Sequence, residues 1–95
     1  MAVIKITRDN FQKEVIESQV PVLVDFWADW CGPCKMLGPI VEDAAKDLEG
    51  SVVVGKVNID EEMDLSEQFR IMSVPTLLVF KNGQIANQSI GVISK

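Results

Sequence analysis

Residues 20–35 read VPVLVDFWADWCGPCK, and the pattern in this stretch decides the fold. Residues 20–27 form a continuous apolar run, which is typical of a strand buried on both faces of a parallel sheet. The CxxC motif of Cys31 and Cys34 follows directly, and apolar side chains then recur at helical spacing as far as Leu48. The sequence therefore predicts a buried strand, a turn that carries two thiols, and a helix.

The rest of the chain continues this alternation of strands and helices. The expected elements are a strand at 3–6, a helix around 11–16, a strand at 51–59, an acidic helix at 61–69, and strands at 76–80 and 84–90. The last two strands are joined by Asn82-Gly83, a strong hairpin-turn signal. The order β-α-β-α-β-α-β-β predicts one α/β domain over residues 1–95. Its central mixed sheet should have four or five strands and be flanked by helices.

Composition limits the classes of function that this chain can have. The 95 residues are 47% hydrophobic, which suits a single modest core, and the net charge is −5. No basic cluster interleaves with aromatic residues, so nucleic acid is not an expected partner. With no histidine and two cysteines, one chain cannot build a four-ligand Cys/His zinc site. A metal site that bridges two chains stays open.

The apolar stretches are too short to cross a membrane. The longest of them, residues 20–28, contains both Pro21 and Asp25. Residues 1–7 have neither the basic start nor the long apolar run of a signal peptide. We therefore expect a cytoplasmic protein with no membrane partner. In that compartment a lone CxxC motif is more often catalytic than structural.

The two cysteines are better placed for chemistry than for stability. A disulfide that closes a loop of about four residues contributes roughly 2 kcal/mol in the chain-entropy model, against about 3 kcal/mol for fifteen residues. The order strand, CxxC, helix places Cys31 at a helix N-terminus, where free N–H groups and the helix dipole favour a thiolate. Cys34, one turn further along, is expected to be more buried. These positions predict that Cys31 attacks a substrate disulfide and that Cys34 resolves the mixed disulfide.

Asp25 interrupts the apolar run before the CxxC motif. A carboxyl inside a doubly buried strand should have a raised pKa, and it could then accept the proton of Cys34. The alternative is a strand end at which Asp25 reaches solvent. Lys56, in the apolar strand at 51–59, is the natural charged partner of Asp25. The alternative for Lys56 is a surface lysine whose stem lies along apolar surface.

Three further residues, in or next to the predicted motifs, need an interpretation. Trp30 either packs into the core or contacts a protein substrate from an exposed loop, and the loop position favours contact. Trp27 is assigned mostly to the core. Pro75 stands just before a strand, where a proline is disfavoured in a central position. A cis peptide bond would resolve that conflict, but the spacing alone does not establish one.

Taken together, these motifs resemble the thioredoxin family over nearly the whole chain, from Val3 to about Val92. The matching segments are VDFWA (24–28), WCGPCK (30–35), Lys56 before VNID (57–60), VPT (74–76) and FKNG (80–83). The resemblance implies a thioredoxin-like fold and the reduction of disulfides in protein substrates. It implies no bound cofactor, because a Cys31–Cys34 disulfide carries the electrons. A thioredoxin reductase that uses NADPH would recycle the oxidised form.

The resemblance also assigns roles to individual residues. Cys31 is implied as the nucleophile, Cys34 as the resolving cysteine, and Asp25 with Lys56 as a buried proton-handling pair. Pro75 is implied as the family's cis proline. The residues expected to contact substrate are Trp30, Gly32, Pro33, Val74, Pro75 and Gly91. The Gly-Pro pair between the cysteines is similar to the reductant branch of the family.

One departure from the family concerns its last helix, which this chain is expected to lack as a C-terminally truncated domain. The absence would leave an apolar sheet face exposed, and such a face is expected to favour self-association. Two rival functions follow from the sequence. One is a binding module whose exposed face matters more than its thiols, and the other is an interchain metal bridge through paired CxxC motifs.

Overall fold

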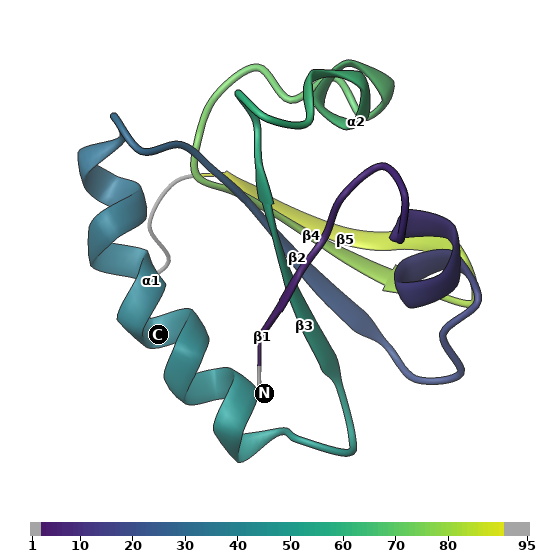
Figure 1. The fold of residues 1–95 in the computed structure, drawn as a ribbon. Coiled ribbons are helices and arrows are strands. Elements are labelled where there is room, and N and C mark those ends of the chain that lie inside the picture. The colour runs from purple at the N-terminus through teal and green to yellow at the C-terminus, as the bar shows by residue number, and fades with distance from the viewer. Residues whose placement is uncertain (1–2, 91–95) are drawn as a thin grey trace.

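The computed structural model describes residues 3–90, and it consists of a central sheet with helical segments on both faces (Figure 1). Gly91, one of the expected substrate contacts, lies outside the described residues. The elements in chain order are β1 (Val3–Lys5), the π-helical turn η1 (Gln12–Ile16), β2 (Val22–Trp27), α1 (Gly32–Asp47), β3 (Val53–Asn58), α2 (Met63–Gln68), β4 (Thr76–Lys81) and β5 (Gln84–Ile90). This order confirms the predicted alternation of strands and helices.

The five strands form one mixed sheet in the order β1-β3-β2-β4-β5. β1 and β2 both pair in parallel with β3, whereas β4 is antiparallel to β2 and to β5. The predicted α/β fold with a mixed sheet is therefore confirmed. The antiparallel part of the sheet begins at β4, which runs against both of its neighbours.

The connection from β3 to β4, residues 59–75, contains one short helix, α2. The six residues of α2 span only about 9 Å at 1.5 Å per residue, whereas the six residues of β3 extend about 20 Å. The chain enters β4 at the edge of the sheet where β3 ends and does not cross back to the edge where β3 begins. Thr76 at the start of β4 accordingly pairs with Phe26 near the end of β2.

Alternate side chains of β2 enter two different cores. Val22, Val24 and Phe26 are fully buried on the face that packs against η1 and α2. On that face the ring of Phe69, just after α2, meets the ring of Phe80 at 5.5 Å between centroids. The opposite face, called the α1 face here, is covered by α1 through Leu37, Val41 and Ala45. Asp25 belongs to the α1 face by the same alternation.

The α1 face of the sheet becomes polar toward β5. Leu77 of β4 is buried beneath α1 and Val79 is half-buried, but their register partners on β5 are Ser89 and Asn87. On the α1 face the β5 sequence therefore places polar side chains where a bare apolar surface was expected, although Ile85 and Ile90 of β5 are exposed elsewhere on the strand. Met36 and Ile40 of α1 are exposed apolar residues on this side of the molecule.

Candidate active site

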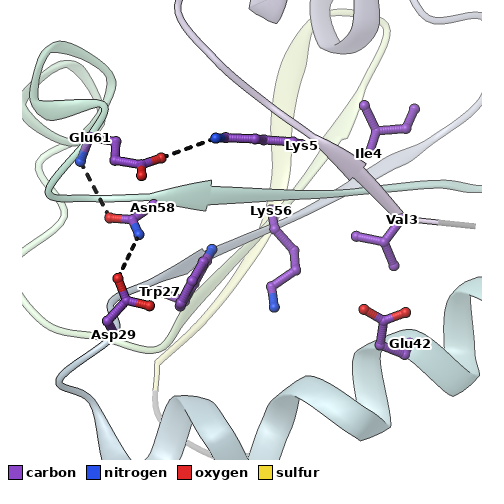
Figure 2. Close-up of a pocket in the computed structure, with 9 residues that line it drawn as sticks. All are labelled: Val3, Ile4, Lys5, Trp27, Asp29, Glu42, Lys56, Asn58 and Glu61. Atoms are coloured by element: carbon purple, nitrogen blue, oxygen red, sulfur yellow. Dashed lines mark hydrogen bonds and ion pairs between the residues drawn. The ribbon is translucent and has the colours of Figure 1, made fainter.

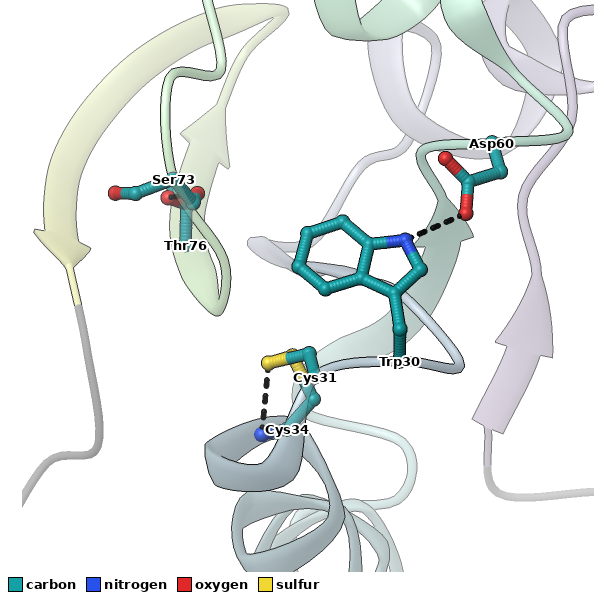
Figure 3. The surroundings of a disulfide bond; sticks show 6 residues. All are labelled: Trp30, Cys31, Cys34, Asp60, Ser73 and Thr76. Carbon is teal, nitrogen blue, oxygen red and sulfur yellow. Dashed lines mark hydrogen bonds between the residues drawn. A yellow bond between two sulfur atoms is a disulfide. The ribbon is translucent and has the colours of Figure 1, made fainter.

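Cys31 and Cys34 form a disulfide at the N-terminus of α1, at the end of the central strand β2 (Figure 3). Their Cα atoms are 5.3 Å apart. Cys31 is the N-cap residue, and its Sγ accepts a hydrogen bond of 3.1 Å from the backbone N–H of Cys34. Gly32 and Pro33 form the exposed first turn of α1. A proline is tolerated there because an N–H group in the first turn has no hydrogen-bond partner within the helix.

Burial does not distinguish the two cysteines. Cys31 is 4% exposed and Cys34 is 6% exposed, so the expectation that Cys34 is the more buried residue is wrong. The turn folds both side chains against Ala28 and against the neighbouring Val74. What separates the cysteines is their place on the helix, because the N–H groups and the dipole of α1 favour negative charge on Cys31 Sγ.

The Val74–Pro75 segment packs beside the disulfide. The peptide bond between these residues is cis, as the family resemblance implied, and Pro75 is buried. The hydroxyl of Thr76 donates a hydrogen bond of 2.7 Å to the carbonyl of Ser73 and so closes the turn around the proline. Figure 3 shows this turn on the side of the disulfide opposite Trp30.

Trp30 is exposed and yet held in a defined orientation. Its side chain is 67% exposed, which excludes the packed-core alternative, and its Nε1 donates to Asp60 Oδ2 at 2.9 Å (Figure 3). Asp60 in turn donates its backbone N–H to Asn58 Oδ1 at 2.9 Å. Sequence reasoning missed Asp60. The available signal was its position just after β3, since parallel strands end at the same edge of the sheet.

Asp25 is buried without a complete set of hydrogen bonds. The residue is 1% exposed, and its Oδ1 has no hydrogen-bond partner among the described residues. Burial raises the pKa of Asp25 from 3.8 to about 6, and the positive charge of Lys56 opposes that rise. The alternative of a solvent-exposed strand end is therefore wrong for Asp25.

Lys56 stands beside Asp25 in the sheet but does not form an ion pair with it. The two residues are Cα partners in the parallel register of β2 and β3. The Lys56 Nζ instead lies 4.6 Å from the ring centroid of Trp27, and no ion pair to Asp25 occurs within 4 Å among residues 3–90. Lys56 and Trp27 both line a groove of about 490 Å³ between β1, β3 and α1 (Figure 2).

The described part of the chain has neither a metal-binding cluster nor a membrane-spanning helix. No group of three or more histidine, cysteine, aspartate or glutamate side chains is arranged to hold a metal ion within residues 3–90. Over the same range, no helix has the length and apolar content needed to span a bilayer.

The fold and the site together define a class of protein: an α/β domain that presents a redox-active disulfide at a helix N-terminus. The thioredoxin family model matches residues 2–95. The thioredoxin of Rickettsia felis is 51% identical over 95% of this chain and 86% of its own length. Thioredoxin 1 of a Nostoc species is 47% identical over 99% of this chain and 88% of its own length. The thioredoxin of Pseudomonas aeruginosa is 40% identical, with coverages of 98% and 86%.

The chain belongs to the thioredoxin family. It is a protein-disulfide oxidoreductase whose redox centre is the Cys31–Cys34 disulfide.

Proposed function

We propose that the reduced form of this chain transfers two electrons to disulfides of protein substrates, with Cys31 as the nucleophile. The observation that carries this assignment is the N-cap position of Cys31, whose Sγ receives a backbone N–H at 3.1 Å. Helix N-termini stabilise thiolate over thiol, and the thiolate is the attacking species. Cys34 lies one turn further into α1, where this stabilisation is weaker.

The first step breaks the substrate disulfide. The Cys31 thiolate attacks one substrate sulfur, a mixed disulfide forms, and the other substrate sulfur leaves as a thiolate. The exposed Trp30, held by Asp60, and the Val74–Pro75 turn flank the reacting sulfur and offer a contact surface to the substrate. We assign Gly32 and Pro33 to the same surface because both are exposed beside Cys31.

The second step regenerates the protein disulfide. Cys34 loses its proton and attacks Cys31 Sγ, and the substrate sulfur leaves as its second thiolate. Asp25 is the proposed proton acceptor, because a carboxyl with a pKa of about 6 can exchange protons near neutral pH. A cystine has no S–H to donate, so no hydrogen bond from Cys34 Sγ to Asp25 is expected in the oxidised form. Lys56 moderates the pKa of Asp25 through its charge.

The oxidised protein must be reduced again for turnover. We propose that a thioredoxin reductase supplies the electrons from NADPH, so that this chain itself binds no cofactor. The proposed compartment is the cytoplasm, where thiols are kept reduced. An assay of NADPH consumption with a bacterial thioredoxin reductase and insulin tests this route. NADPH oxidation that does not depend on this chain would contradict the proposal.

A trapping experiment tests the roles of the two cysteines. Cys34→Ser leaves the first step intact but blocks the second, so it should accumulate mixed disulfides through Cys31. The matched control, Cys31→Ser, should trap no partners when mixed with the same protein disulfides. Accumulation on the Cys31→Ser variant alone would reverse the assignment.

Self-association stays a prediction from the sequence. The α1 face is polar along β5, whereas Met36 and Ile40 on α1 are 68% and 52% exposed and lie one helical turn apart. Sedimentation velocity at protein concentrations from about 5 to about 500 μM tests the prediction, because weak protein dimers dissociate in about this range. Ile40→Lys is the matched variant. A monomer at every concentration would refute it.

A further inference from the structure

The Lys56 ammonium has two candidate partners on the α1 face. Asp25 is the Cα partner of Lys56 on the neighbouring strand β2, and Trp27 follows Asp25 by two residues, so all three side chains share one face. A lysine stem is long and flexible enough to reach either group. The ammonium lies over the indole of Trp27, 4.6 Å from the ring centroid, and within residues 3–90 it makes no ion pair with Asp25.

Solvation explains why the indole can compete with a carboxyl. Asp25 is 1% exposed, so an ammonium placed against it would lose most of its water. Trp27 and Lys56 are half-buried and line the groove of about 490 Å³, where the ammonium keeps one side open (Figure 2). Tryptophan is also the strongest aromatic partner for a cation at this distance.

The other charged groups around the groove do not account for the position of Lys56. Lys5 on β1 pairs with Glu61 at 3.3 Å, and Asp29 lies 3.5 Å from the amide nitrogen of Asn58. Glu42 on α1 also lines the groove, but it forms no ion pair with Lys56 within the described residues. The register partner of Asp25 on β4 is the uncharged Leu77. Lys56 is therefore the charged one of the two residues that pair with Asp25 in the sheet.

We propose that Trp27 is a positioning residue, whose indole holds the Lys56 ammonium in the groove and away from the Asp25 carboxyl. The inference rests on the proposed proton-acceptor role of Asp25 and deepens it. Because the ammonium stays at a distance, burial affects the Asp25 carboxyl more than the charge of Lys56 does, and its pKa is about 6. A direct Asp25–Lys56 pair would hold the carboxylate ionised and make it a weaker proton acceptor.

A titration of Asp25 by carboxyl ¹³C NMR on the oxidised protein tests the inference directly. Trp27→Leu removes the aromatic face, so the pKa of Asp25 should fall by about one pH unit as Lys56 moves toward the carboxyl. Trp27→Phe keeps a weaker face and should give a smaller fall. In a Lys56→Met background, Trp27→Leu should leave the pKa of Asp25 unchanged. An unchanged pKa in Trp27→Leu itself, or an equal fall in both backgrounds, would overturn the inference.

A second measurement can be made on the wild-type protein. Ring currents of Trp27 should shift the Hε protons of Lys56 upfield in the wild-type protein, and Trp27→Phe should reduce that shift. Lys56 Hε resonances at their ordinary position in the wild type would overturn the inference even if Trp27→Leu does not fold. Both measurements use the resting protein. If they succeed while Asp25→Asn leaves the resolution of a mixed disulfide unchanged, the proton-acceptor role fails and the positioning role stands.

Discussion

Replacing Asp25 with asparagine tests whether the buried carboxyl destabilises the folded protein at neutral pH. The side chain is 1% exposed, and burial raises its pKa from 3.8 to about 6 against the opposing charge of Lys56. A raised pKa means that the folded state binds this proton more tightly than the unfolded chain does. The stability that protonated Asp25 contributes is therefore fully present below pH 3.8 and is lost as the pH rises through about 6.

The size of the effect follows from the two pKa values. They differ by about two pH units, and at 1.36 kcal/mol for each unit the ionised Asp25 destabilises the folded state by about 3 kcal/mol above pH 7. Asparagine is neutral at every pH. The gain in the free energy of unfolding on Asp25→Asn should therefore be about 3 kcal/mol larger at pH 8 than at pH 3.5.

Urea denaturation of the oxidised wild-type and Asp25→Asn proteins between pH 3.5 and 8 measures this difference. The oxidised form is used because disulfide-bonded cysteines do not titrate. Asp43→Asn is the matched control, since it removes an exposed carboxylate from α1 and should show no such pH-dependent gain. A difference between Asp25→Asn and wild type that is the same at every pH would refute the reasoning.

Three glycine substitutions test the packing and the backbone of the fold by thermal or urea denaturation. Gly55→Ala should lower the free energy of unfolding by about 2 kcal/mol, because its Cβ would overlap the buried side chain of Ile6. Gly83→Ala should lower it by more than about 1 kcal/mol, since φ is +78° at this hairpin position. Gly38→Ala should instead raise it by about 0.5–1 kcal/mol, because a Cβ in α1 meets nothing within 4 Å. A stabilised Gly55→Ala or a destabilised Gly38→Ala would contradict these assignments.

The sequence alone determined the features that depend on neighbours along the chain. The apolar run at 20–27 predicted the buried strand β2, and helical spacing after Cys34 predicted α1. Asn82-Gly83 predicted the turn between β4 and β5, since few dipeptides adopt two positive φ angles readily. The position of Cys31 at a helix N-terminus followed from the same local order, and with it the chemistry of the two thiols.

The tertiary structure decided the features that depend on distances across the sheet. The direction of β4 depended on the edge of the sheet to which the chain returns after α2. The partner of Trp30 is Asp60, thirty positions away, because β2 and β3 end at the same edge. The strand register places Lys56 beside Asp25, but the ammonium lies over Trp27. The contact that a long flexible side chain makes depends on solvent exposure and local charge, which only the tertiary structure determines.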